Sequence, residues 1–327
     1  MFDNLIAKLK SAQSVVLSTH RNCDGDGLGA EVALYHGLNK AGINTRIINV
    51  DRPSKKYDFL QTSKMVEVYQ SGKTPLPKFD MALILDTNDE RLVAPLFQDL
   101  TAVCQNIHFV DHHPLLSTGA STTATSVIET NAASTGEMAY NILQRLNISL
   151  DPSIAQALYT SIVFDTQLFR YIRQRSHSHK IAAELLQFEI DAEEIHRYLF
   201  STYTVEKLSF LARAINGVEY YRSNRVAIIH LLARDFRDNQ LELDESGDVI
   251  DMVMNIESVE AAALIREDLP GHFKISLRSK GKVEILPVAE LLGGGGHKHS
   301  AGAYIQGDYM ELHNKILLEL EALVAQV

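Results

Sequence analysis

The sequence predicts an α/β protein with an N-terminal parallel-sheet domain covered by helices on both faces and a smaller C-terminal α+β domain. Three observations predict this fold class. Short apolar runs alternate with amphipathic stretches in the first half, which is typical of a parallel sheet. Strand-like runs dominate the second half and lead into one long helical pattern. The length of 327 residues fits two domains at one domain per roughly 150 residues.

The first half contains four apolar runs that we expect to be buried strands, at Ser14–Ser18, Thr45–Val50, Met81–Leu85 and Ile107–Val110. Helical patterns lie between or after them, at Gly29–Ala41, Ser134–Leu146, Ile154–Val163 and His179–Leu186. Because nearly every position of these short runs is apolar, both faces of the sheet are expected to be covered. We set the N-terminal domain at residues 1–191.

The second half has a different order of predicted helices and strands. The stretch Ala192–Val218 has no cluster of turn residues, so we expect helix there and take 192–222 as a helical connector. Strands are predicted at Arg225–Leu231, Ala261–Arg266, His272–Arg278 and Ala301–Ile305, with a helix at Tyr309–Val324. We set the C-terminal domain at 223–327.

Composition narrows the class of protein. The hydrophobic fraction of 46% and the charged fraction of 22% are those of a globular chain. No apolar run approaches the roughly 18 residues of a membrane span, and the first ten residues do not resemble a signal peptide. Two cysteines, Cys23 and Cys104, cannot form a disulfide framework, so we expect a cytoplasmic location. A net charge of −10 argues against tight binding of long nucleic acid.

Histidines and aspartates gather where predicted strands end. The first strand leads into a loop containing His20, Asp24 and Asp26, the third leads into Asp86, and the fourth leads into Asp111, His112 and His113. Asp165 follows a predicted helix that could return it to the same place. Because ligands bind at the carboxyl ends of parallel strands, we expect these groups to converge there. Their charges would repel one another without cations. Oxygen and imidazole ligands suit manganese(II), with iron(II), cobalt(II) or magnesium as alternatives.

Each motif, taken alone, could also be explained without a metal site. Asp24 and Asp26 alone would fit a solvated turn, and Asp86 alone would fit a helix cap. A sharper alternative is the pattern Gly25–Ala30, which matches the fingerprint of a dinucleotide-binding oxidoreductase, with Asp51 in place for the ribose. Against it, Asp24 and Asp26 would face the pyrophosphate, and the later aspartates and histidines would have no role.

The motifs as a set resemble a known family. The pattern His20-x-x-x-Asp24-x-Asp26 followed by Asp111-His112-His113 resembles the DHH phosphoesterase superfamily, which includes RecJ-type exonucleases and family II pyrophosphatases. The second half resembles the DHH-associated domain. The pieces that carry this likeness, and a closer one to the NrnA branch of nanoRNases and pAp phosphatases, are Lys274–Lys280, Gly293–His297, Ala133–Glu137 and Phe164–Tyr171.

The resemblance implies roles for single residues. His20 and Asp24 would hold one metal ion, Asp26, His112 and Asp165 the second, and Asp86 would bridge the two. His113 would face the scissile phosphate, and Asp111 would orient His112 from behind. The residues expected to bind substrate are Asn22, Arg278, Ser279, Gly294, Gly295, Gly296 and His297. Cys23 lies beside the metal loop, so some sensitivity to oxidants is also expected.

The resulting expectation is a manganese-dependent phosphodiesterase and phosphatase. Two ions would generate a bridging hydroxide that hydrolyses very short RNA and pAp. Alternatives in the same chemistry are a phosphodiesterase for cyclic or linear dinucleotide signals and an inorganic pyrophosphatase. A dinucleotide-dependent oxidoreductase is the remote alternative. Short oligonucleotides or pAp are the expected partners, with no membrane and no long nucleic acid. The family allows a homodimer, for which the sequence shows no interface.

Overall fold

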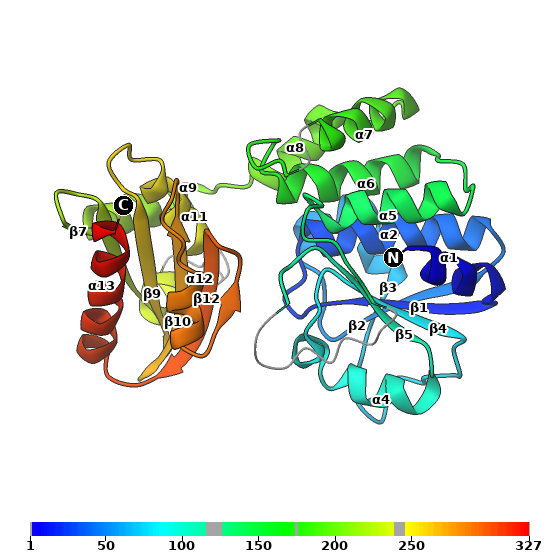
Figure 1. The fold of residues 1–327 in the computed structure, drawn as a ribbon, viewed down its shortest axis with the longest axis horizontal. Helices are drawn as coiled ribbons and strands as arrows, with labels where there is room; N and C mark the ends of the chain where they lie inside the picture. Colours follow the sequence, from blue (N-terminus) through cyan, green and yellow to red (C-terminus); the bar gives the residue numbers. More distant parts are fainter. Residues whose placement is uncertain (1, 116–125, 174–175, 239–245, 327) are drawn as a thin grey trace. The chain divides into compact units, whose positions relative to one another are not determined.

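The computed structural model describes residues 2–115, 126–173, 176–238 and 246–326 (Figure 1). The chain divides into two compact units, Met1–Thr202 and Tyr203–Val327. The expected connector 192–222 contains α8 (Ala192–Phe200), which closes the first unit, and α9 (Val205–Asn216), which opens the second. Within the described ranges, no helix is both long and apolar enough to cross a membrane.

The first unit is built on a six-stranded sheet in which every neighbouring pair is parallel. Its strands are β1 (Ser14–Thr19), β2 (Asn44–Asn49), β3 (Val66–Val68), β4 (Met81–Leu85), β5 (Ile107–Asp111) and β6 (Val127–Ile128). The spatial order is β3-β2-β1-β4-β5-β6. The four predicted strands are therefore confirmed to within one residue. The two strands that were not predicted, β3 and β6, are short and lie at the two edges.

Helices cover both faces of this sheet. They are α1 (Phe2–Ser11), α2 (Gly25–Lys40), α3 (Thr62–Met65), α4 (Leu96–Val103), α5 (Thr135–Arg145), α6 (Pro152–Asp165), α7 (His177–Leu185) and α8, with three 3₁₀ turns, η1 (Lys55–Leu60), η2 (Glu90–Val93) and η3 (Leu186–Phe188). Figure 1 shows α1, α2, α5 and α6 on one face and α4 on the other. A separate hydrophobic core lies on each face of the sheet. Along β1, Val15 and Leu17 pack in one of these cores and Val16 packs in the other, which explains the unbroken apolar run.

Two helices differ from the prediction where the candidate site lies. The helix expected at Gly29 begins at Gly25, because the side chain of Asp24 caps it by accepting from the backbone N–H of Asp26 at 2.9 Å. Gly29 also lies so close to α6 that a Cβ would come within 2.5 Å of the carbonyl oxygen of Ala157. The glycines of this stretch thus belong to a packed helix rather than to a loop. At its far end, α6 extends to Asp165, which is its last residue.

The second unit contains a mixed six-stranded sheet in the order β11-β12-β10-β9-β8-β7, with only β8 and β9 parallel. Its elements are α9, β7 (Glu219–Tyr221), β8 (Val226–Leu232), α10 (Ala233–Arg237), α11 (Gly247–Met254), β9 (Ala261–Leu269), β10 (His272–Ser279), α12 (Leu286–Leu291), β11 (Gly295–Gly296), β12 (Ser300–Gln306) and α13 (Tyr309–Ala325). Along β8, Val226 and Ile228 pack with α13, whereas Ala227 and Ile229 pack with α9 and α11. The predicted α+β class is confirmed.

Candidate metal centre

The candidate site lies at the carboxyl ends of β1, β4 and β5. The order of strands reverses between β1 and β4, and in open parallel sheets ligands bind at the carboxyl edge at such a point. Three groups of side chains there each have their ligand atoms within 4.8 Å of one another. They are His20 with Asp24 and Asp86; Asp26 with His112 and Asp165; and Asp86 with Asp111, His112 and His113.

Asp86 lies between the other groups. Its Oδ2 is 3.5 Å from Nε2 of His20, and its Oδ1 is 3.6 Å from Nε2 of His112. The hydroxyl of Thr135 donates to Oδ1 at 3.0 Å. The backbone of Asp86 has a φ of 59°, a left-handed conformation that non-glycine residues adopt only where the surroundings enforce it. The two carboxylate oxygens therefore face two different histidines.

Asp26 is held by the start of α5. Its carboxylate accepts from the backbone N–H of Thr135 at 2.9 Å and of Gly136 at 3.2 Å, and also from the hydroxyl of Ser161. Amides at a helix N-terminus stabilise a negative charge. Its Oδ2 lies 3.3 Å from Nε2 of His112, which is 3.6 Å from Asp165. The side chain of Asp26 is thus fixed in position by donors that leave it facing the histidine.

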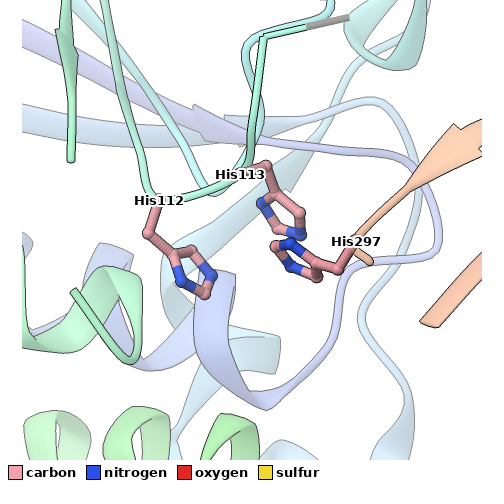
Figure 2. Close-up of side chains that lie close together, drawn as sticks. All are labelled: His112, His113 and His297. Carbon is pink, nitrogen blue, oxygen red and sulfur yellow. The ribbon is translucent and has the colours of Figure 1, made fainter. Parts of the chain in front are cut away.

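Figure 2 shows the two neighbouring histidines that follow β5, His112 and His113. Different groups orient their rings. Nδ1 of His112 lies 3.3 Å from the carbonyl oxygen of Ala132, so it carries the hydrogen and Nε2 faces the carboxylates. Nδ1 of His113 lies 2.8 Å from Oδ1 of Asp111, whose Oδ2 accepts from Asn88 at 2.6 Å. We expected Asp111 to orient His112. Its carboxylate instead meets the ring of His113 and, at 2.8 Å, only the backbone N–H of His112.

Crowding of like charges changes the acidity of this site. Burial, together with the charge of Asp86, raises the pKa of Asp24 and of Asp26. Burial alone would lower the pKa of His20, but its interactions with Asp86 and Asp24 outweigh that and raise it to about 10. Burial also raises the pKa of Asp165. Buried carboxylates beside imidazoles, without a thiolate among them, form a donor set that fits divalent cations of the manganese and magnesium type.

The loop between β1 and α2, which contains His20 and Asp24, explains two further sequence features. The backbone N–H of Asn22 donates to Asp51 at 2.7 Å, so Asp51 fixes this loop and does not stand free to bind a ribose. At Gly27 a Cβ would collide with the hydroxyl of Thr19, so the glycine is needed for packing. Both observations remove support from the oxidoreductase alternative. Burial and the nearby carboxylates raise the pKa of the Cys23 thiol, which disfavours the thiolate and with it the expected oxidant sensitivity.

In the second unit, the residues expected to bind substrate gather at one end of its sheet. Arg278 and Ser279 end β10, and Gly295 and Gly296 form β11, which pairs with the start of β12. A Cβ at Gly294 would collide with the carbonyl oxygen of Gly302, so close strand packing requires this glycine. Contacts within this unit include three polar ones: Arg278 Nε is 3.3 Å from Asp251 Oδ1, Ser279 donates to the carbonyl of Val283 at 2.6 Å, and the N–H of His297 donates to the carbonyl of Ser300 at 2.6 Å.

Comparison with protein families matches both halves of the chain. Residues 14–162 match the model of the DHH family N-terminal domain, and residues 225–326 match the DHHA1 domain. The chain therefore contains a DHH N-terminal domain followed by a DHHA1 domain. The DHH family is made up of phosphoesterases, which makes the chain a hydrolase of phosphoric esters.

The similarity to relatives and to solved structures extends over nearly the whole chain. A probable bifunctional oligoribonuclease and PAP phosphatase NrnA of Streptococcus mutans is 25% identical over 306 residues, covering 92% of this chain and 93% of the relative. The crystal structure of an exopolyphosphatase-related protein from Bacteroides fragilis is 22% identical, covers 98% of this chain and 97% of its own, and has a TM-score of 0.86. The exonuclease RecJ bound to manganese is 15% identical, covers 98% of this chain and 94% of its own, and has a TM-score of 0.50.

Several side chains of the DHH domain that hold the site were missed at the sequence level. The hydroxyl of Ser161 donates to Asp26, that of Thr135 donates to Asp86, and the side-chain amide of Asn88 donates to Asp111. The sequence pattern Ser-x-x-Glu before α5 does indicate a helix start, so amides facing a carboxylate could have been anticipated there. Arg173 donates to the carbonyl oxygens of His112, Thr130 and Ala132 at 3.1–3.3 Å. No sequence signal marks this arginine, because its partners are backbone atoms.

Proposed function

We propose that this chain is a metal-dependent enzyme that hydrolyses very short RNA oligonucleotides and pAp. The observation that carries the proposal is the arrangement of two groups of ligand atoms on either side of Asp86, each within 4.8 Å. Sharing one carboxylate between two divalent ions is the arrangement used for phosphoryl hydrolysis. The NrnA relative, named as an oligoribonuclease and PAP phosphatase, supports the substrate class.

The metal ligands divide into two sets. We assign His20 and Asp24 to one ion and Asp26, His112 and Asp165 to the other, with Asp86 shared. The separate contacts of its two oxygens, to His20 at 3.5 Å and to His112 at 3.6 Å, support the sharing. Manganese(II) is our choice of metal, because imidazole and carboxylate occur together and because RecJ is known with manganese bound. Such ions neutralise phosphate charge and acidify a bound water.

His113 is the residue we assign to the scissile phosphate. Its Nδ1 is held by Asp111 at 2.8 Å, which leaves Nε2 directed away from that carboxylate. Burial alone would lower the pKa of His113, but the charge of Asp111 outweighs it and raises the pKa. In its protonated form the ring can donate to a phosphoryl oxygen and stabilise the charge that develops there. Asp111 is then a positioning residue that orients the ring and favours its charged form.

Substrate binding is assigned to the DHHA1 domain and to Asn22 of the metal loop. The gathering of Arg278, Ser279 and the glycine strand at one sheet end supports this. Arg278 pairs with Asp251, whose side chain is 45% exposed. An exposed pair of this kind contributes little, so a phosphate could replace the aspartate as the partner of the guanidinium. The net charge of −10 favours short anions over long RNA.

We place the enzyme in the cytoplasm. Both cysteines, Cys23 and Cys104, are buried and free. Unpaired buried thiols are typical of a reducing compartment.

The experiment that tests the function uses four substrates side by side with manganese(II): an RNA dinucleotide, pAp, a cyclic dinucleotide and pyrophosphate. We expect rapid cleavage of the dinucleotide or pAp that is lost on chelation and restored by manganese(II). The matched controls are Asp86→Asn, which removes the shared carboxylate, and Asp80→Asn, at the opposite end of the same strand. Cleavage of only the cyclic dinucleotide or only pyrophosphate would overturn the substrate assignment. Activity that survives chelation would overturn the metal assignment.

A further inference from the structure

A strained segment, which ends at Arg173, follows the candidate ligand Asp165. We call residues 166–173 the rim segment. Three successive residues in it have left-handed backbone conformations, Gln167 with φ 47°, Leu168 with φ 60° and Phe169 with φ 65°. Non-glycine residues hold such angles only where the surroundings enforce them, and such strain concentrates at binding and catalytic sites.

The rim segment is attached to the metal centre at both ends. At its start, the N–H of Leu168 donates to the carbonyl oxygen of Val163 at 3.0 Å, and the N–H of Tyr171 donates to that of Thr166 at 2.9 Å. At its end, Arg173 donates to the carbonyl oxygen of His112 at 3.2 Å. The segment therefore runs from one candidate metal ligand, Asp165, to the backbone of another.

The side chains of the rim segment are divided between core and solvent. Phe169 packs against the main core of the DHH domain, with its ring centroid 4.7 Å from that of His179. Leu168, Tyr171 and Ile172 are instead exposed, to 48%, 54% and 38%. Single exposed apolar residues are ordinary, but three within five positions of a strained turn are not. The rim segment thus exposes three apolar side chains shortly after the candidate ligand Asp165.

Tyr171 is the aromatic member of this surface, and a cation accompanies it. The guanidinium carbon of Arg170 lies 5.3 Å from the centre of the Tyr171 ring. An exposed aromatic face beside a positive charge is the arrangement on which single-stranded nucleic acids stack their bases. The surface is the size of a few side chains, and the segment that carries it joins Asp165 to the backbone of His112, two candidate metal ligands. Both points favour a nucleobase over a protein partner as its occupant.

We propose that Tyr171 is a stacking surface for the nucleobase next to the scissile phosphate, with Arg170 beside the same nucleotide. The proposal rests on the proposed function and deepens it. Stacking on a ring face is tolerant of base identity, so this contact selects nucleotides over pyrophosphate without selecting one base. Tyr171 would then act mainly on substrate binding, because the ring holds no candidate metal ligand.

The test measures KM and kcat of Tyr171→Ala and Tyr171→Phe with an RNA dinucleotide and with two analogues, each lacking one of the two bases. For Tyr171→Ala we expect a rise in KM of about tenfold on the dinucleotide, with kcat within about twofold of the unchanged protein. Tyr171→Phe should behave like the unchanged protein. On the analogue that lacks the stacked base, Tyr171→Ala and the unchanged protein should have equal KM values. Tyr220→Ala is the matched control, because Tyr220 is also exposed, to 39%, and lies in β7, at the opposite sheet edge from β11.

Each other outcome is decisive. An unchanged KM for Tyr171→Ala, in a preparation whose unchanged protein cleaves the dinucleotide, overturns the stacking role. An equal loss of kcat on the dinucleotide and on both analogues also overturns it, because the ring would then only support Asp165. If the unchanged protein cleaves pyrophosphate but no nucleotide, the proposed function fails first.

Discussion

In the DHH domain Asp26 and Asp86 are almost fully buried beside two histidines, with exposed fractions of 2% and 3%. In the DHHA1 domain the ion pair of Arg278 and Asp251 is 28% and 45% exposed. Burial and like charges raise the pKa of the carboxyl groups in the first site, whereas the second site is an ion pair that water already reaches. We infer that the buried cluster gains most from binding a cation, and that the exposed arginine can exchange its partner at little cost.

Asp86→Asn should have the largest effect on the buried site of the DHH domain, because it removes the charge shared by both ligand groups. We expect hydrolysis to fall by a factor on the order of 10³ while the fold is kept. Asparagine is chosen because it tolerates the left-handed φ of 59° at this position, whereas alanine would add strain. Steady-state rates and circular dichroism check the two halves of the expectation.

Asp80→Asn is the control for that experiment. Asp80 accepts from the backbone of Gln13 and Ser14 at the other end of β4, so its loss should touch stability and leave hydrolysis intact. If Asp86→Asn retained a tenth or more of the activity, the shared carboxylate would have no place in the mechanism.

Two tightly packed glycines, one in each domain, allow the roles of the two domains in catalysis and in substrate binding to be compared. Gly29→Ala would push α6 away from α2, and Gly294→Ala would separate β11 from β12. Overpacking of this kind costs about 1–3 kcal/mol in each case. Gly29→Ala should also lower kcat because α6 carries Asp165, whereas Gly294→Ala should raise KM. Thermal melts and kinetics measure both, and Gly247→Ala, where a Cβ meets nothing within 4 Å, should change neither.

Arg278→Ala tests the substrate site that we propose at the exposed Arg278–Asp251 ion pair of the DHHA1 domain. Without the guanidinium, KM for pAp and for the dinucleotide should rise about tenfold, because a charge-assisted hydrogen bond to phosphate is lost. The value of kcat should stay close to that of the unchanged protein, since the metal centre is in the other domain. An unchanged KM would remove Arg278 from the substrate site. Arg225→Ala, which breaks the ion pair with Glu260, is the matched control.

The smallest effect concerns the pH dependence of stability in the metal-free protein. The folded pKa of His20, about 10, lies above the ordinary value of 6.5, so its contribution is complete below pH 6.5 and is lost as the pH rises towards 10. The melting temperature should therefore fall between pH 7 and 9, and less so with manganese(II) bound. His20→Asn should flatten this slope.

His230 of the DHHA1 domain titrates in the opposite direction. Burial lowers the pKa of His230, so its contribution is complete above pH 6.5 and is lost as the pH falls. His230→Phe should therefore leave the slope between pH 7 and 9 unchanged. If His230→Phe, rather than His20→Asn, flattened that slope, the electrostatic difference between the two domains would be wrong.

Much of the fold could be predicted because its signals are local. The central strands were found from unbroken apolar runs, whereas β3 and β6 were missed because two or three residues carry no pattern. The start of α2 was misplaced because its glycines are selected by contact with α6, which no local pattern shows. The same limit applies to the site. Most candidate ligands could be predicted because they follow strands, and the structure brings them together. Arg173 could not, because it binds backbone oxygens, and Ser161 could not, because it lies 135 residues from Asp26.

The most direct measurement is the number of manganese ions that the active protein retains per chain after equilibration and removal of free metal. We predict two ions in the unchanged protein and fewer in Asp86→Asn, with hydrolysis lost as the second ion is lost. Full activity with one ion per chain, or with none, would contradict the shared-carboxylate centre at the carboxyl edge of the DHH sheet.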